Sequence, residues 1–246
     1  MEWQDVGVLL RLQEFGEDQL IGVFLTQKHG CVRGIMPFRV SDKKRDKIIH
    51  PGSRAQVRWK ARLSEHLGRF DIDPEYSPLA KLMHDPEALA GLSAICSIVE
   101  TWTPAHEPHE NLYFMLQTMI NDLTSSTWPV KYVQFEVELL RELGFGLDLE
   151  TCALTGAKSN LIYVSPDTGR ALSEKAIPVR NQEDGLLDLP SFLSPTRVND
   201  EWTWDQILQG MELTGHFFQG HLCEASSKSM PIARDRLFGQ FKSKAS

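Results

Sequence analysis

The chain has 246 residues, of which 41% are hydrophobic and 24% are charged, and its four cysteines lie far apart. This composition excludes a largely disordered chain, and the cysteine spacing argues against a secreted disulfide scaffold. No run of about 18 uncharged apolar residues is present, as a membrane span requires, and the acidic first residues do not resemble a signal peptide. We therefore expect a cytoplasmic protein with no membrane contact.

The net charge of −7 conceals an asymmetry along the chain. Residues 1–70 hold 13 Lys/Arg and 8 Asp/Glu, a net of +5, whereas the remaining residues hold 13 and 25, a net of −12. Within residues 33–69 there are 11 basic and 3 acidic residues. This pattern indicates a polyanion-binding module joined to a part of the chain that repels polyanions.

The N-terminal part of the sequence predicts short strands separated by turns. The runs lie near residues 6–10, 19–26, 31–38, 55–63 and 69–73. The clearest is 55–63, where Ala, Val, Trp, Ala and Leu alternate with Gln, Arg, Lys and Arg, as expected of a strand with one buried face. Five strands and no good helix in about 75 residues favour a small barrel or sandwich.

From Tyr76 onward the hydrophobic period becomes helical. A turn-rich stretch at 161–171, around Ser-Pro-Asp-Thr-Gly, predicts a hairpin between the helices. The change of period places a domain boundary near 73–77. Helices are expected at 78–83, 86–102, 111–123, 130–143, 206–222 and 232–241.

Basic residues gather on the fourth predicted strand and in the loop before it. Arg58, Lys60 and Arg62 share one face of that strand, opposite its apolar face. Such a face, with the lysines and arginines of the loop, is suited to a nucleic-acid backbone. A solvated outer face that discourages edge pairing has the same appearance, so the charges alone leave both interpretations open.

Motifs for catalysis or metal binding are weak. His106 and His109 stand three residues apart with Pro108 between them, whereas a zinc-protease helix needs histidines four apart. No phosphate-binding glycine loop and no Gly-x-Ser-x-Gly elbow occur, and Cys152 is typical of a buried structural cysteine. We expect no catalytic residue, no metal and no cofactor.

Several segments in a fixed order resemble the RecO family of DNA repair proteins. They are Gly16-Glu17-Asp18, residues 25–30 (LTQKHG), the basic loop, residues 135–145 (FEVELLRELGF) and residues 163–171 (YVSPDTGRA). The resemblance implies an α+β multidomain fold, with a five-stranded OB-fold barrel in residues 1–77 and an α-helical domain with a small β-hairpin insertion in residues 78–246.

The resemblance also implies a function in DNA repair and recombination. RecO-like proteins bind single- and double-stranded DNA, anneal complementary strands, and act with RecR to load RecA onto DNA coated by single-strand-binding protein (SSB), whose C-terminal tail is a further expected partner. The protein is then bacterial and works at the nucleoid. The DNA-binding residues expected on this basis are Arg33, Arg39, Lys43, Lys44, Arg45, Lys47, Arg58, Lys60 and Arg62.

One departure from the family concerns a zinc module. Many members carry two Cys-x-x-Cys pairs in the helical domain, and the matching positions here are Cys152, Thr155, Ser173 and Ala176. Thr, Ser and Ala do not supply the thiolates of a structural zinc site. We expect a degenerate module at about 150–176, with packing in place of the metal.

Two other functions remain as alternatives. The first is a protein-interaction adaptor whose basic barrel binds acidic partner tails, and the second, weaker, is a metal hydrolase using His106 and His109. A C-terminal basic cluster offers either a DNA contact or a receptor for an acidic tail; its members are Arg234, Arg236, Lys242 and Lys244.

Overall fold

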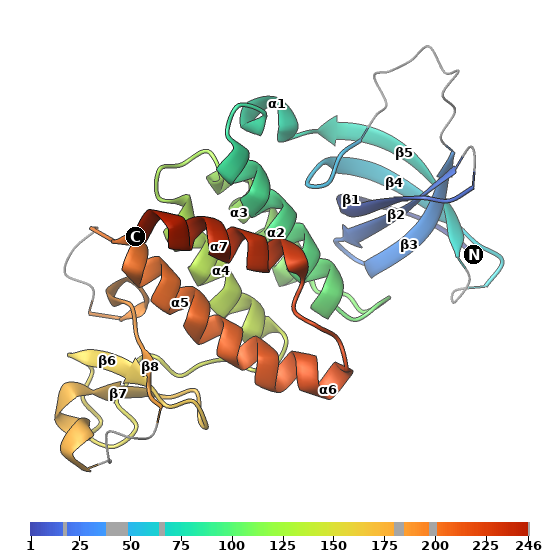
Figure 1. The fold of residues 1–246 in the computed structure, drawn as a ribbon. Helices are drawn as coiled ribbons and strands as arrows, with labels where there is room; N and C mark the ends of the chain where they lie inside the picture. The colour runs from blue at the N-terminus through green and yellow to red at the C-terminus, as the bar shows by residue number, and fades with distance from the viewer. Residues whose placement is uncertain (17–18, 38–48, 64–66, 180–184, 197–200, 246) are drawn as a thin grey trace. The chain divides into compact units, whose positions relative to one another are not determined.

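The computed structural model describes residues 1–16, 19–37, 49–63, 67–179, 185–196 and 201–245. The chain forms two compact units, residues 1–125 and residues 126–246, which we call the N-terminal and C-terminal units. Figure 1 shows the strands of the first and the helices of both.

Five strands of the N-terminal unit form an OB-fold barrel, as the sequence predicts. They pair in the order β1-β2-β3-β5-β4, and β4 returns to β1. All pairings are antiparallel except β3 with β5, which is parallel and consists of two register pairs, Gly34–Gly68 and Ile35–Arg69. The strands are β1 Glu2–Glu14, β2 Gln19–Thr26, β3 Gly30–Pro37, β4 Arg54–Lys60 and β5 Gly68–Tyr76.

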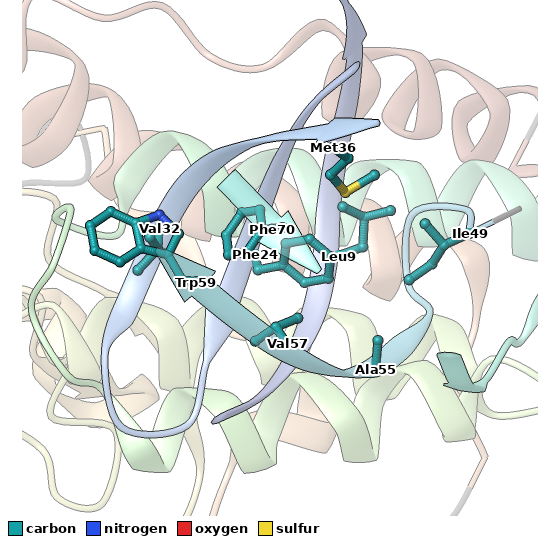
Figure 2. Close-up of a cluster of buried hydrophobic side chains, with 9 residues drawn as sticks. All are labelled: Leu9, Phe24, Val32, Met36, Ile49, Ala55, Val57, Trp59 and Phe70. Atoms are coloured by element: carbon teal, nitrogen blue, oxygen red, sulfur yellow. The ribbon is translucent and has the colours of Figure 1, made fainter. Parts of the chain in front are cut away.

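The barrel is filled by one hydrophobic cluster, which Figure 2 shows as a row of nine side chains between the strands. In β4, Ala55, Val57 and Trp59 are buried while Gln56 and Arg58 are exposed, which confirms the predicted alternation. The cluster consists of Leu9, Phe24, Val32, Met36, Ile49, Ala55, Val57, Trp59 and Phe70.

The predicted fourth strand was too long at its C-terminal end. β4 ends at Lys60, and Leu63, which we expected to face the core, is 55% exposed. The strand stops where its partners stop, because Met1 and Ala61 exchange the last backbone hydrogen bonds at the β1 edge and Lys60 pairs with Arg69 on β5. Arg62 therefore follows the strand instead of belonging to it.

Three helices complete the N-terminal unit: α1 Leu79–Leu82, α2 Pro86–Trp102 and α3 Glu110–Asp122. α2 begins where the sequence predicts, because Asp85 caps two backbone N–H groups and Pro86 occupies the first turn. Glu100 on α2 pairs with Arg11 on β1 at 2.9 Å. Gly52 lies so close to α2 that a Cβ there would be 2.6 Å from the Leu92 side chain. The barrel and these helices are therefore packed as one body.

The C-terminal unit contains a group of packed helices and, at one side of them, a small sheet (Figure 1). The predicted hairpin is present as β6 Leu161–Val164 and β7 Ala171–Ser173, and a third strand, β8 Leu187–Asp188, pairs with β6. The helix predicted at 206–222 is α5 Trp204–Phe217, followed by a π-helical segment, η4 Phe218–Cys223. The other elements are α4 Trp128–Glu142, η2 Glu174–Val179, η3 Ser191–Leu193, α6 Glu224–Ser226 and α7 Ile232–Ala245.

A buried ion pair joins three helices of this unit. Arg234 on α7 donates to Glu136 on α4 at 2.7 and 2.9 Å, and also to the Met211 carbonyl and Thr214 hydroxyl on α5. Both charged side chains are at most 6% exposed. Burial by itself lowers the pKa of Arg234, but the Glu136 carboxylate raises it above its usual value. Our interpretation of Arg234 as part of an accessible basic cluster was therefore wrong.

Among the helices that the structure describes, none is long and apolar enough to cross a membrane.

Candidate nucleic-acid interface

Four of the nine predicted DNA-binding residues lie in the described barrel. Arg33, Arg58, Lys60 and Arg62 all have exposed side chains. The other five, Arg39, Lys43, Lys44, Arg45 and Lys47, fall within residues 38–48 and are outside the described residues.

The register of the barrel brings one group of these cations together with a residue that we did not predict. Lys60 on β4 stands directly opposite Arg69 on β5, and Arg69 in turn stands opposite Ile35 on β3, two residues after Arg33. Arg62 follows the end of β4. We call Arg33, Lys60, Arg62 and Arg69 the rim cations; all are exposed and lie where β4 ends and β5 begins.

The rim cations form a surface that favours an anion. Like charges directly opposite each other on neighbouring strands destabilise a sheet, and Lys60 and Arg69 are such a pair. Lys60 lies 3.4 Å from the Glu2 carboxylate, but both side chains of that pair are largely exposed, so Glu2 screens the charge of Lys60 only weakly. An anion placed between the two strands would relieve this repulsion.

The opposite end of the same outer surface is acidic. Arg58 stands between Gln4 on β1 and Asp71 on β5, and with the Gln4 amide oxygen turned toward it, Arg58 donates two hydrogen bonds to Gln4. Farther along β5, Asp73 is exposed, and Glu75 pairs with Arg54 at 2.9 Å. Arg58 is therefore less available to a ligand than the rim cations.

Sequence reasoning missed Arg69 although a signal was present. The predicted strand at 69–73 alternates, and burial of Phe70 forces Arg69 and Asp71 outward. The position of Arg69 beside Lys60 depends on the pairing register, which the alternation alone does not give.

An aromatic stack closes the barrel beside the rim cations. The Trp3 ring lies parallel to the His29 ring, with centroids 4.0 Å apart, and parallel to the Trp59 ring at 5.4 Å. Trp59 is buried and its indole N–H donates to the Arg33 carbonyl at 3.1 Å, so the innermost ring is tied to a rim residue. Trp59 is buried and Trp3 is half-buried, and the His29 side chain is 34% exposed.

The turn that carries His29 is held rigidly. The buried Asp5 carboxylate accepts hydrogen bonds from the backbone N–H groups of Val6 and Lys28, and it lies 2.9 Å from His29 Nδ1. The backbone N–H of His29 donates to the Thr26 hydroxyl. Gly30 has a φ of +69°, and a Cβ there would clash with the backbone of Glu107. The imidazole plane is thus fixed before any ligand binds.

Three of the four positions matching the zinc module also come together. Cys152 Sγ accepts hydrogen bonds from the Ser173 N–H, the Ser173 hydroxyl and the Thr155 N–H, at 3.2 to 3.4 Å. The hydroxyls of Thr155 and Ser173 are 3.2 Å apart, and Ala176 is buried. One thiol, two hydroxyls and a methyl group do not make a zinc site; here hydrogen bonds join the loop to the hairpin.

Those hydrogen bonds change the acidity of the thiol. Burial raises the pKa of Cys152, but hydrogen bonds from the side chains and backbone of Ser173 and Thr155 outweigh burial and lower the pKa to about 6.

The segment with His106 and His109, which suggested a metal hydrolase, connects α2 to α3 and bonds to the barrel through its backbone. The His106 N–H donates to the Cys31 carbonyl of β3, and His109 precedes the first turn of α3. Within the described ranges, no group of three or more His, Cys, Asp or Glu side chains is placed to hold a metal ion.

Comparison with known proteins agrees with this architecture. Residues 1–73 match the family model "Recombination protein O N terminal" and residues 83–231 match "Recombination protein O C terminal". The DNA repair protein RecO of Rhodospirillum centenum is 38% identical over 245 residues, covering 98% of this chain and 95% of that protein. RecO proteins of Cereibacter sphaeroides strain KD131 and Bradyrhizobium sp. are 38% and 36% identical, each covering 96% of this chain and 97% and 94% of their own lengths. The chain therefore belongs to the RecO family of DNA repair proteins.

Proposed function

We propose that this chain is a non-enzymatic recombination mediator that binds single- and double-stranded DNA through its OB-fold domain, residues 1–77. The observation that carries the proposal is the group of rim cations, in which Lys60 and Arg69 face each other across neighbouring strands. Cations that contact the phosphates of two DNA strands at once lower the repulsion between those strands, which is the physical requirement for annealing.

The charge distribution supports a division of labour. The net charge is +5 over residues 1–70 and −12 over the rest, so DNA binding belongs mainly to the barrel, and the acidic helical part is available for proteins. In the family context the protein partners are RecR and SSB, and the outcome of their action is the loading of RecA at the nucleoid of the bacterial cytoplasm.

The C-terminal basic cluster is a poor receptor for the acidic SSB tail. Arg234 forms a buried ion pair with Glu136, and the Lys244 ammonium lies over the Trp204 ring, 4.5 Å from its centroid. A groove of about 320 Å³ beside α4 is no better, because two carboxylates, Glu138 and Glu150, stand in its lining beside Arg141. We therefore propose no site for the tail in these two places.

A salt titration tests the proposal. The intact chain is titrated with labelled single-stranded DNA and, separately, with an acidic peptide, over a range of salt concentrations. A mediator binds DNA with a slope of log affinity against log salt of about −0.7 for each single-strand phosphate contact. Binding to the peptide without binding to DNA would favour the adaptor instead.

A further inference from the structure

The stack of Trp59, Trp3 and His29 ends in the His29 ring, whose outer face has no aromatic neighbour among the described residues. Within the part of the chain that the structure describes, Trp3 is the one ring stacked on His29. A second stacked histidine shows the contrast, because His221 has Phe145 at 4.9 Å and Phe217 at 5.8 Å. His221 thus has two aromatic neighbours, whereas His29 has one.

The fold already restricts the His29 ring to one plane, so a ligand does not have to bear the entropic cost of ordering it. Three contacts fix the His29 imidazole. Its Nδ1 lies against the buried Asp5 carboxylate, the backbone N–H of His29 donates to the Thr26 hydroxyl, and the ring lies parallel to Trp3. A preorganised flat surface binds a flat ligand with less loss of freedom than a mobile side chain does.

Cationic residues adjoin the members of the stack along the chain. Lys28, next to His29, is exposed. Lys60 follows Trp59 in β4, and the carbonyl of Arg33 accepts the Trp59 indole N–H. A flat aromatic face beside several cations is the combination that single-strand-binding proteins use, with the base on the ring and the phosphates on the cations.

We propose that the outer face of His29 is a stacking site for one nucleobase of single-stranded DNA, whose flanking phosphates lie on Lys28 and the rim cations. This inference rests on the proposed DNA-binding function and adds a contact that a duplex does not make, because duplex bases are already stacked. His29 therefore biases the barrel toward single strands, while the rim cations serve both forms.

The test compares three ligands of equal length on the full chain: labelled oligothymidylate, an abasic phosphodiester strand and a duplex. We expect His29→Ala to weaken oligothymidylate binding about fivefold or more, the lower end for loss of one stacked base. Affinity for the abasic strand and the duplex, and the salt slope, stay unchanged. His29→Tyr restores the flat face and the affinity. The matched control His221→Ala, which also removes a stacked imidazole, changes none of these values.

A second measurement uses the unmodified protein. Ultraviolet crosslinking to an iodouracil-containing single strand is expected to label the tryptic peptide of residues 29–33, which begins with His29. Two results would overturn the stacking site. One is an equal loss of affinity for all three ligands in His29→Ala; the other is normal oligothymidylate binding by that variant together with no crosslink at this peptide in the unmodified protein. Failure of the unmodified chain to bind any of the three would overturn the proposed function itself.

Discussion

Arg234 and Lys60 are both cations in segments where the sequence suggested a ligand site, yet their surroundings are opposite. Arg234 is buried and donates to a carboxylate, a hydroxyl and a carbonyl of its own chain. Lys60 is 73% exposed as a side chain and faces another cation. The comparison teaches that the local density of basic residues does not identify a binding surface; the number of partners within the fold does.

The largest expected effect comes from breaking the buried pair. Arg234→Ala leaves the Glu136 carboxylate buried without its partner, and we expect the free energy of unfolding to fall by about 3–5 kcal/mol. Denaturant unfolding measures this loss of stability. At low temperature, the fraction of the variant that remains folded is expected to bind DNA like the unmodified chain. The exposed neighbour Arg236 serves as the control, since Arg236→Ala changes stability by less than about 0.5 kcal/mol. A stable Arg234→Ala variant would contradict the buried network.

Charge reversal of the exposed barrel cations is expected to change DNA affinity and to leave stability nearly unchanged. Replacing Arg58, Lys60 and Arg62 together by Glu lowers DNA affinity, with little loss of stability. The magnitude of the salt slope falls by about 0.7–0.9 for each phosphate that the variant no longer binds. Because Arg58 donates to Gln4 and stands opposite Asp71, Arg69→Glu alone should cost more affinity than Arg58→Glu alone. An unchanged slope in the folded triple variant would place the DNA elsewhere.

The Cys152 cluster predicts a smaller effect with a defined pH dependence. Cys152→Ala removes the acceptor for three hydrogen bonds and is expected to cost about 1–3 kcal/mol. The folded thiol has a pKa of about 6, below its usual value of 9.0, so between these two pH values the unfolded state binds more protons. The stabilisation by ionised Cys152 should therefore grow as the pH rises through this range and disappear as the pH falls below the folded pKa.

Thiolate absorbance measures the same ionisation directly, as the difference between the unmodified chain and Cys152→Ala. Cys96 does not interfere, because burial raises its pKa to about 12. A chelator should leave the melting temperature unchanged; stoichiometric zinc in the purified protein would show that the hydrogen-bonded description of this hairpin is wrong.

The smallest expected effect tests the acidic end of the barrel surface. Asp71→Asn with Asp73→Asn removes two exposed carboxylates from the same strand as Arg69, and DNA affinity is expected to rise by less than about fivefold, since exposed charges interact weakly. The increase should vanish at high salt. The corresponding Glu→Gln substitutions at Glu138 and Glu142 on α4 are the control and leave DNA affinity unchanged.

Sequence patterns predicted the elements well where the local signals are strong. β2 and α2 have the predicted bounds, because a run of β-branched and aromatic residues fills 19–26 and because Asp85 and Pro86 mark the helix start. The patterns failed where the deciding partner is distant. Arg234 meets Glu136 across 98 residues, the end of β4 depends on β1 and β5, and the pairing of Lys60 with Arg69 depends on strand register.

The candidate site was predictable in part for the same reason. Arg33, Lys60 and Arg62 were identified by charge and are exposed, but His29 was not, because nothing in the local sequence says that its ring lies on Trp3. That contact joins the first strand to the turn between the second and third, so it exists only once β1 has paired with β2.

The hydrogen-bonded Cys152 cluster has a consequence for how the protein matures. A hairpin that holds zinc is complete only after an ion has been captured, so the yield of active protein follows the metal supply of the cell. Here the parts that join the hairpin to its neighbouring loop are a thiol, two hydroxyls and backbone groups of the chain itself. Once synthesis has passed Ser173, every group needed to close this cluster is already on the polypeptide, and a cell starved of zinc can assemble it as readily as one that is replete.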